Sequence, residues 1–271
     1  VAVITQPDMP VGRHQNEVQP SEVKKYAQEH QLPVLQPEKM KDPAFVEELR
    51  SFRANLQVVV AFRMLPEVVW SMPEYGTFNV HAALLPQYRG AAPINWAVIN
   101  GETQTGVTTF FLDKEIDTGR IIMQMPFDIP DEADVEYVYN GLMHLGSEVC
   151  LKTLDCIIEA DGHPESFPQA KLEAKFSRLY EAPKLFKNTC EIHWDRPCKR
   201  IYDFIRGLSP YPGAWTQLVG PDGKVIDMKI FKTSKTQKSV GMRPGMIVIN
   251  KGVLYITTAD FLLQIDELQL A

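Results

Sequence analysis

The chain has 271 residues, of which 45% are hydrophobic and 23% are charged. This balance is typical of a globular protein that buries a core, and it excludes a disordered chain and a small disulfide scaffold. No apolar run approaches the ~20 residues of a membrane-spanning helix, so we expect no membrane partner. The formal net charge of −6 at first argues against a polyanionic partner.

The cysteines form no Cys-x-x-Cys pair and have no histidine at zinc-finger spacing; they are Cys150, Cys156, Cys190 and Cys198. We therefore expect reduced thiols in a cytoplasmic protein, and no metal site. The chain opens on the apolar run 1–4, which predicts a buried strand and does not resemble a signal peptide.

In residues 1–160, short apolar runs alternate with amphipathic stretches. The continuous run 56–62 predicts a strand covered on both faces, and Ser21 is placed to cap the first helix. The alternation predicts parallel strands joined by right-handed crossovers, an α/β fold with a Rossmann-like, doubly wound parallel sheet. The expected strands are 1–4, 33–35, 56–62, 77–81, 105–113 and 120–128, and the expected helices are 21–30, 43–55, 66–72, 93–100 and 135–160.

From residue 161 the pattern changes. Residues 161–183 are polar without a sustained period, which indicates a linker that crosses the surface, and residues 184–271 form a second domain. One helix, 198–207, is followed by five short runs with turn residues between them, which predicts a small open β-barrel of the oligonucleotide-binding (OB-like) type. These runs are 215–219, 225–231, 246–250, 253–257 and 261–270.

The charge divides at the same place. Residues 184–271 carry 13 basic and 8 acidic side chains, a net +5, which leaves 15 basic and 26 acidic side chains, a net −11, on residues 1–183. This split favours a basic module that meets phosphates, attached to an acidic catalytic body.

Three side chains suited to catalysis lie near expected strand ends. Asn79 and His81 are two residues apart at the end of one strand, so both point to one face. Asp117 follows the strand 105–113. Because ligands bind at the carboxyl ends of parallel strands, we expect an amide, an imidazole and a carboxylate to meet in one crevice.

Longer motifs surround these residues. They are Asn-x-His at 79–81, Leu-Leu-Pro-x-Tyr-Arg-Gly-Ala-Ala-Pro at 84–93, Gly-Glu-x-x-Thr-Gly-Val-Thr at 101–108 and Ile-Asp-Thr-Gly at 116–119. Together they resemble the 10-formyltetrahydrofolate-dependent formyltransferases. Two flanking motifs, Thr-Gln-Pro-Asp-x-Pro-x-Gly-Arg at 5–13 and Ile-Arg-Gly-Leu-Ser-Pro-Tyr-Pro-Gly-Ala-Trp at 205–215, favour the members that act on methionyl-tRNA.

The resemblance implies that the α-amine of initiator methionyl-tRNA attacks the formyl carbon carried by the folate. The product is N-formylmethionyl-tRNA for translation initiation. Asn79 and His81 resemble the family's donors to the developing oxyanion, and Asp117 resembles the carboxylate that organises a water and moves protons. Asp117 should also favour the charged form of a nearby His81. Ala83 stands where the family commonly has serine.

The resemblance also implies the residues that bind the substrates. Folate is expected beside the end of the run 56–62 and beside Ile116, through Phe62, Arg63, Met64 and Leu65. Arg13 matches the family's arginine that enters the tRNA acceptor stem, although the following residues 14–17 are less basic than is usual. Candidates for tRNA backbone phosphates in the second domain are Lys199, Arg200 and Arg206.

Two other functions stay open. One is a folate-dependent formyltransferase that acts on an amino sugar nucleotide, and the other is a nucleic-acid-binding protein whose first domain is a relic. The motif at 5–13 and the intact motif at 116–119 argue against the former, and the complete set of Asn79, His81 and Asp117 argues against the latter. The family also begins with a strand and helix that are missing here and extends past Leu270. We therefore expect a longer natural polypeptide, active as a monomer.

Overall fold

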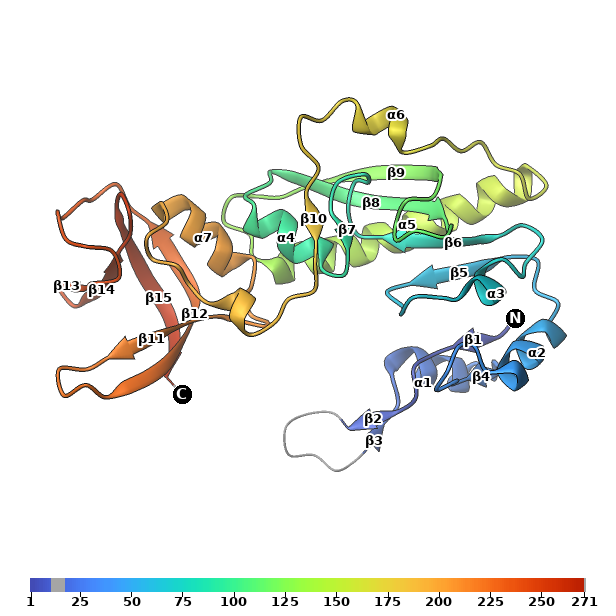
Figure 1. Ribbon diagram of the computed structural model, residues 1–271, viewed down its shortest axis with the longest axis horizontal. Helices are drawn as coiled ribbons and strands as arrows, with labels where there is room; N and C mark the ends of the chain where they lie inside the picture. Colours follow the sequence, from blue (N-terminus) through green and yellow to red (C-terminus); the bar gives the residue numbers. More distant parts are fainter. Residues whose placement is uncertain (11–17, 271) are drawn as a thin grey trace.

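The computed structural model describes residues 1–10 and 18–270. The first part of the chain contains two pieces of β-sheet (Figure 1). In the smaller piece β1 (Val3–Ile4) pairs in parallel with β4 (Val34–Leu35). The larger piece has the strand order β5 (Gln57–Val60), β6 (Thr77–His81), β8 (Gln104–Phe111) and β9 (Ile121–Asp128).

The larger sheet is mixed. β5 and β6 run parallel, but β8 is antiparallel to both β6 and β9. The expectation of an all-parallel, doubly wound sheet is therefore wrong for this half of the sheet, because β8 and β9 form a hairpin. The local sequence pattern of a strand is the same in either direction, so the residues alone did not distinguish the two pairings.

The helices of the first part follow the apolar periodicity closely. They are α1 (Glu22–Glu29), α2 (Pro43–Ser51), α3 (Glu67–Trp70), α4 (Pro93–Ile99) and α5 (Val135–Glu159). The predicted cap is confirmed, since the Ser21 hydroxyl accepts a hydrogen bond from the Lys24 backbone N–H at 3.2 Å. The long helix α5 lies along β8 and β9 (Figure 1) and buries Val138, Leu142 and Val149 against them. None of the helices in the described ranges is long and apolar enough to cross a membrane.

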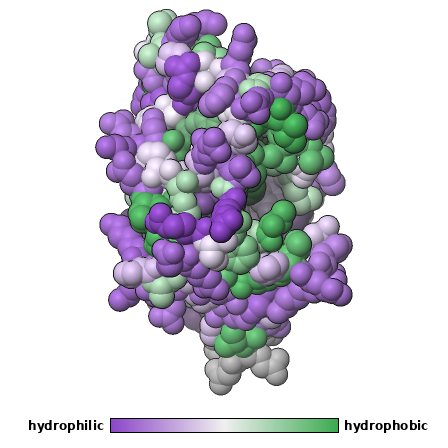
Figure 2. Space-filling view, turned by 90° about the vertical axis from the view of Figure 1, so that its right-hand side faces the viewer, coloured by the Kyte–Doolittle hydropathy of each residue, from purple (hydrophilic) through white to green (hydrophobic). Residues whose placement is uncertain are grey.

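One strand is less covered than its sequence predicts. Val58 and Val60 of β5 are 43% and 61% exposed, whereas the continuous apolar run predicted burial on both faces. Within residues 1–10 and 18–270, no hydrogen-bonded strand lies beyond β5, so it is an edge of the sheet. Seen from the right-hand end of Figure 1, hydrophobic residues border a hollow at mid-height (Figure 2).

Several short elements carried no sequence signal. They are the strand pairs β2 (Met9–Pro10) with β3 (Val18–Gln19) and β7 (Arg89–Gly90) with β10 (Glu181–Ala182), the helix α6 (Ala170–Glu173) and the 3₁₀ helix η1 (Asn188–Cys190). The β7–β10 pair joins the segment between the two parts of the chain to the loop that follows β6 (Figure 1).

The second part of the chain is a curled antiparallel sheet with α7 (Cys198–Arg206) packed on it. The strand order is β11 (Ala214–Val219), β12 (Val225–Lys235), β15 (Leu262–Leu270), β14 (Val253–Thr257) and β13 (Ile247–Asn250). The five predicted antiparallel strands are therefore present. Among the described residues, β11 and β13 are the two outer strands and do not pair with each other, so the sheet is a curled half-barrel and the predicted OB-like barrel is not confirmed.

The two parts are joined by a buried ion cluster at α7. Asp203, which is 2% exposed, accepts hydrogen bonds from Lys199 Nζ at 2.6 Å and from Arg206 Nε at 2.8 Å. Arg206 Nη1 then donates to the backbone oxygen of Ala133 in the first part at 2.8 Å. Lys199 Nζ also lies 3.4 Å from Oδ1 of Asp131, another first-part residue. Charged residues from both parts of the chain therefore contribute to the contact between the two parts.

Candidate active site

The strand β6 places Asn79 and His81 on one face at the centre of the larger sheet. Alternation along the strand puts both side chains on the same side. His81 is buried, and its ring meets the edge of the Phe110 ring at a centroid distance of 6.4 Å. The imidazole is therefore held firmly against the neighbouring strand β8.

Asp117 reaches this face by a different route from the one predicted. Because β8 is antiparallel to β6, its last residue Phe111 pairs with Phe78, far from His81. The loop 112–120 folds back, and Oδ2 of Asp117 lies 3.8 Å from Nδ1 of His81. Gly119 permits this return, since a Cβ atom there would lie 1.6 Å from the Phe111 carbonyl oxygen. The expected meeting of imidazole and carboxylate occurs, but a loop produces it instead of parallel strand ends.

The Asp117 loop is held by contacts that the sequence did not indicate. Asp117 itself has a left-handed backbone, with φ of 56°. Its carboxylate accepts a hydrogen bond from the Gly90 backbone N–H at 2.9 Å. Gln169 Nε2 donates to the carbonyl oxygens of Asp117 and Gly119 at 2.8 and 2.9 Å. Gln169 lies in the polar segment 161–183, which was expected to be only a linker. A single glutamine in a segment without hydrophobic periodicity does not indicate a functional residue.

His81 has its second ring nitrogen fixed by the backbone. Nε2 donates to the carbonyl oxygen of Tyr88 at 2.9 Å, which leaves Nδ1 facing Asp117. Tyr88 is in turn anchored, because its hydroxyl donates to Glu102 Oε1 at 2.6 Å. Burial, together with the Glu102 carboxylate, raises the pKa of the Tyr88 hydroxyl, so it remains a donor at neutral pH.

Burial lowers the pKa of His81, and the nearby Asp117 carboxylate opposes this effect. The expected influence of Asp117 is therefore present, but desolvation of the ring is the larger cause. A neutral imidazole with Nε2 protonated keeps a lone pair on Nδ1. That lone pair and the Asp117 carboxylate form two adjacent proton acceptors.

Asn79 has a buried side-chain oxygen, Oδ1, that has no hydrogen-bond partner within the described residues. A buried polar atom without a partner is costly, and such atoms gather where a ligand or water completes them. Asn79 therefore fits a position where a substrate supplies the missing polar group.

The residues expected to bind folate follow the carboxyl end of β5, which lies beside the carboxyl end of β6. Met64 is 74% exposed, and Ile116 in the Asp117 loop is 58% exposed, so both offer apolar surface to a ligand. Phe62 and Leu65 instead pack against the core formed by α2 and its neighbours. Arg63 is also engaged, since its guanidinium donates to the backbone oxygens of Pro37 and Glu38.

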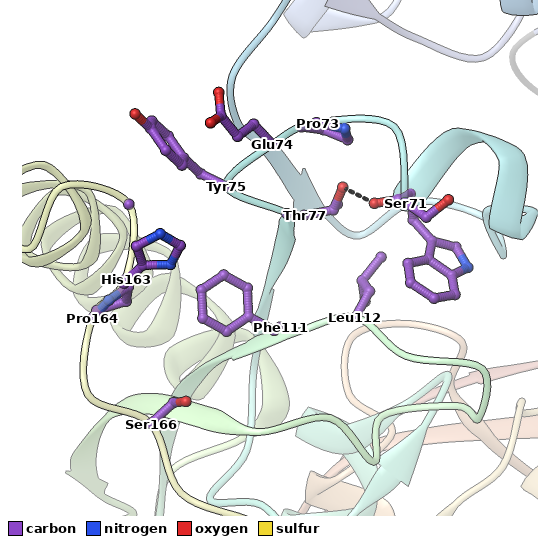
Figure 3. A pocket seen from close by; sticks show the side chains of 13 residues that line it. Ser71, Pro73, Glu74, Tyr75, Thr77, Phe111, Leu112, His163, Pro164 and Ser166 are labelled. Carbon is purple, nitrogen blue, oxygen red and sulfur yellow. Dashed lines mark hydrogen bonds between the residues drawn. The ribbon is translucent and has the colours of Figure 1, made fainter.

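A different hollow, of about 410 Å³, lies at the opposite end of β6 (Figure 3). Thr77 at the start of β6, Phe111 at the end of β8 and His163 after α5 line it. His81 and Asp117 are not part of its lining, so this hollow is separate from the candidate active site.

The residues expected to contact tRNA divide into three groups. Arg13 lies outside the described residues. Lys199 and Arg200 are exposed, although Lys199 pairs with Asp203 and Arg200 donates to the Asn100 carbonyl oxygen at 3.1 Å. The prediction that Arg206 contacts phosphate is wrong. Arg206 is 6% exposed, and its guanidinium donates hydrogen bonds to the Asp203 carboxylate and to the Ala133 carbonyl oxygen.

Comparison with known proteins identifies relatives of this chain. The formyl transferase family model matches residues 1–154, and the formyl transferase C-terminal domain model matches residues 184–271. The chain is 55% identical over 271 residues to the methionyl-tRNA formyltransferase of Bacteroides fragilis, covering 100% of this chain and 82% of that one. The enzyme of the same name from Parabacteroides distasonis is 55% identical over 272 residues, with 100% and 83% covered.

A solved structure shares the fold at lower identity. The crystal structure of an N-formyltransferase from Helicobacter canadensis, in complex with folinic acid and dTDP-3-aminofucose, gives a TM-score of 0.64 with 20% identity. The match covers 97% of this chain and 86% of that one. At 20% identity, this similarity shows a shared fold and nothing further.

Proposed function

The chain belongs to the methionyl-tRNA formyltransferases of the formyl transferase family, and from this premise we propose that it moves a formyl group from 10-formyltetrahydrofolate to the α-amino group of initiator methionyl-tRNA. The observation that carries the proposal is the convergence of His81 and Asp117 on the face of β6 that also carries Asn79, whose Oδ1 has no partner among the described residues. An amide donor and paired proton acceptors are what transfer of an acyl group to an amine requires.

In this reaction Nδ2 of Asn79 donates to the formyl oxygen and stabilises the charge that develops there when the amine attacks. A donor already fixed in a dry site is worth more than the same donor in water, since it needs no reorganisation. Burial of His81 and its contact with Phe110 support a dry site at this face of β6.

Asp117 handles the protons, and His81 assists it. His81 was expected to be a second donor to the oxyanion, but its Nε2 proton is already bonded to the Tyr88 carbonyl oxygen. The attacking amine must lose a proton, and the folate nitrogen that leaves must gain one. Asp117, with Nδ1 of His81 3.8 Å away, is placed to accept the first proton and return it. The bond from His81 Nε2 to the Tyr88 carbonyl keeps Nδ1 on the reacting side.

Met64 and Ile116 are proposed as apolar walls of the folate site. Phe62, Arg63 and Leu65 are proposed to hold the same segment in place through their contacts with the core and the backbone.

We expect Met64→Lys to weaken equilibrium binding of a folate analogue, because a charged side chain would replace an exposed apolar surface. Titration of the analogue by fluorescence or calorimetry measures this. Met242→Lys changes another exposed methionine in the second part and is the control. Unchanged affinity in Met64→Lys would remove this wall from the site.

The second part, residues 184–271, is proposed as the OB-like tRNA-contacting domain, joined by the linker 161–183 to a catalytic domain of residues 1–160. Lys199, Arg200 and Arg13 are the proposed phosphate contacts. We further propose that the protein works as a monomer in the cytoplasm.

We expect the affinity for methionyl-tRNA to fall steeply with ionic strength. Each neutralised phosphate releases counterions, so two or three contacts lower the affinity about 10-fold or more between about 50 and 200 mM salt. Filter binding or fluorescence anisotropy across that range gives the slope of log K against log salt. A flat response would refute the phosphate contacts, whereas folate binding serves as the salt-insensitive control.

The experiment that tests the function is turnover with 10-formyltetrahydrofolate and charged initiator tRNA. We expect N-formylmethionyl-tRNA as the product, identified after mild hydrolysis of the ester. Uncharged tRNA is the control. Absence of formylmethionine with a folded protein would overturn the assignment.

A further inference from the structure

The segment between the two parts of the chain, residues 161–183, is hydrogen-bonded to the first part at several points. Its residue Phe167 exchanges two backbone hydrogen bonds with Ile121, of 2.9 and 3.0 Å. Farther along, the Tyr88 N–H donates to the Tyr180 carbonyl at 2.7 Å, and β10 pairs with β7. Figure 1 shows α6 above β9 and β10 beside β7. This connection is therefore docked on the first part of the chain, at β9 and at the segment that follows β6.

Gln169 is the most deeply buried polar side chain of this segment, with 3% of it exposed. Both protons of its Nε2 are used, on the carbonyl oxygens of Asp117 and Gly119. Its Oε1 accepts from Arg89, at 3.1 Å from Nε and 2.6 Å from Nη2. Every hydrogen-bonding group of the amide is thus satisfied, and all of the partners belong to the loops around Asp117.

Asp117 needs such support. Its φ of 56° is a strained conformation for a residue with a side chain, and it persists only where the surroundings fix it. Arg89 contributes as well, since Nε donates to the Asp117 carbonyl at 3.2 Å, and its Nη2 is held by Glu173 at 2.7 Å. The backbone of Asp117 is therefore held from its carbonyl side by two residues of the connecting segment, directly by Gln169 and through Arg89 by Glu173.

We propose that Gln169 is a positioning residue for Asp117, so that the segment joining the two parts of the chain sets the place of the catalytic carboxylate. This inference rests on the proposed function, in which Asp117 moves protons. Gln169 does not touch the reacting atoms. It acts by fixing the left-handed turn that aims the Asp117 carboxylate at His81.

The test is Gln169→Glu. The glutamate has the same shape and still accepts from Arg89, but it replaces the Nε2 donor with an oxygen that faces two carbonyl oxygens. We expect kcat for formyl transfer to methionyl-tRNA to fall about 10- to 100-fold, because small displacements of a catalytic group are costly. The KM values for folate and tRNA should change little, since Gln169 is 3% exposed and its amide is fully bonded within the protein.

Gln87→Ala is the matched control. Gln87 ties the same segment down by donating to the Arg178 carbonyl at 2.9 Å and accepting from the Tyr180 N–H at 2.8 Å, without touching Asp117. We expect its kcat to stay near that of wild type. Amide hydrogen exchange of residues 113–120 is the second readout and should be faster in Gln169→Glu than in the control.

The outcomes separate cleanly. A wild-type protein that does not formylate methionyl-tRNA overturns the proposed function. An active wild type with an unaffected Gln169→Glu variant overturns the positioning role alone. Equal losses of kcat in Gln169→Glu and Gln87→Ala would also overturn it, because the segment would then matter only as a structural support.

Discussion

Asn79→Ala is expected to lower kcat for formyl transfer about 100- to 1000-fold, which corresponds to about 3 kcal/mol of lost transition-state stabilisation. The side chain sits on the central strand β6, and its buried Oδ1 accepts no hydrogen bond from the described residues. Its removal should therefore cost activity while the free energy of unfolding stays close to that of wild type. Asn140→Ala, on the exposed face of α5, is the control.

Asp117→Asn tests the residue that is proposed to move the protons. The amide keeps the size of the carboxylate and an oxygen for the Gly90 N–H, but it cannot take up a proton. We expect kcat to fall about 100-fold or more, the range for loss of a general acid–base group. The pKa of His81 should fall below its wild-type value, because burial is then unopposed by the Asp117 charge. NMR titration of the imidazole measures this direction, and a rise would contradict the arrangement. Near wild-type turnover in Asn79→Ala and in Asp117→Asn would remove these residues from catalysis.

Asp203→Ala is expected to give the largest loss of stability, about 3–5 kcal/mol, since it leaves the Arg206 guanidinium buried without a carboxylate. Chemical denaturation followed by fluorescence measures the change. Asp195→Ala removes an exposed carboxylate from the same part of the chain and should have little effect.

A double variant identifies the cause of that loss. Asp203→Ala with Arg206→Met removes both charges and leaves apolar groups in their place. We expect it to be more stable than Asp203→Ala alone, because the buried unpaired charge is gone. If Asp203→Ala unfolds like wild type, the ion cluster does not hold the two parts of the chain together.

Local features of the fold were predictable because they depend on neighbours in the sequence. The strand β6 was predicted with its observed bounds, and the Ser21 cap followed from residue type and position. The antiparallel direction of β8 was not predictable, since a strand's pattern does not record its partner. The exposure of Val60 was missed for the same reason.

The candidate site was only partly predictable. Asn79, His81 and Asp117 carry recognisable chemistry within recognisable motifs. Gln169 and the Tyr88 carbonyl act through contacts across 52 and 7 residues of sequence, and neither has a pattern of its own. Arg206 shows the opposite error, because a basic residue on a helix resembles a phosphate contact until its buried partner Asp203 is known.

The charge division also has a more specific meaning in the structure. Lys199 and Lys235 of the basic second part both pair with Asp131 of the acidic first part. Part of the opposite charge therefore joins the two parts. Lys232, which is exposed on β12, takes no part in that pairing.

The central claim concerns the acceptor of the formyl group, and a competition assay tests it most directly. The wild-type protein is given labelled 10-formyltetrahydrofolate together with charged initiator tRNA and a UDP-amino sugar in one reaction. The account predicts that the label appears on the methionine esterified to tRNA. Label on the amino sugar, with none on methionyl-tRNA, would contradict it.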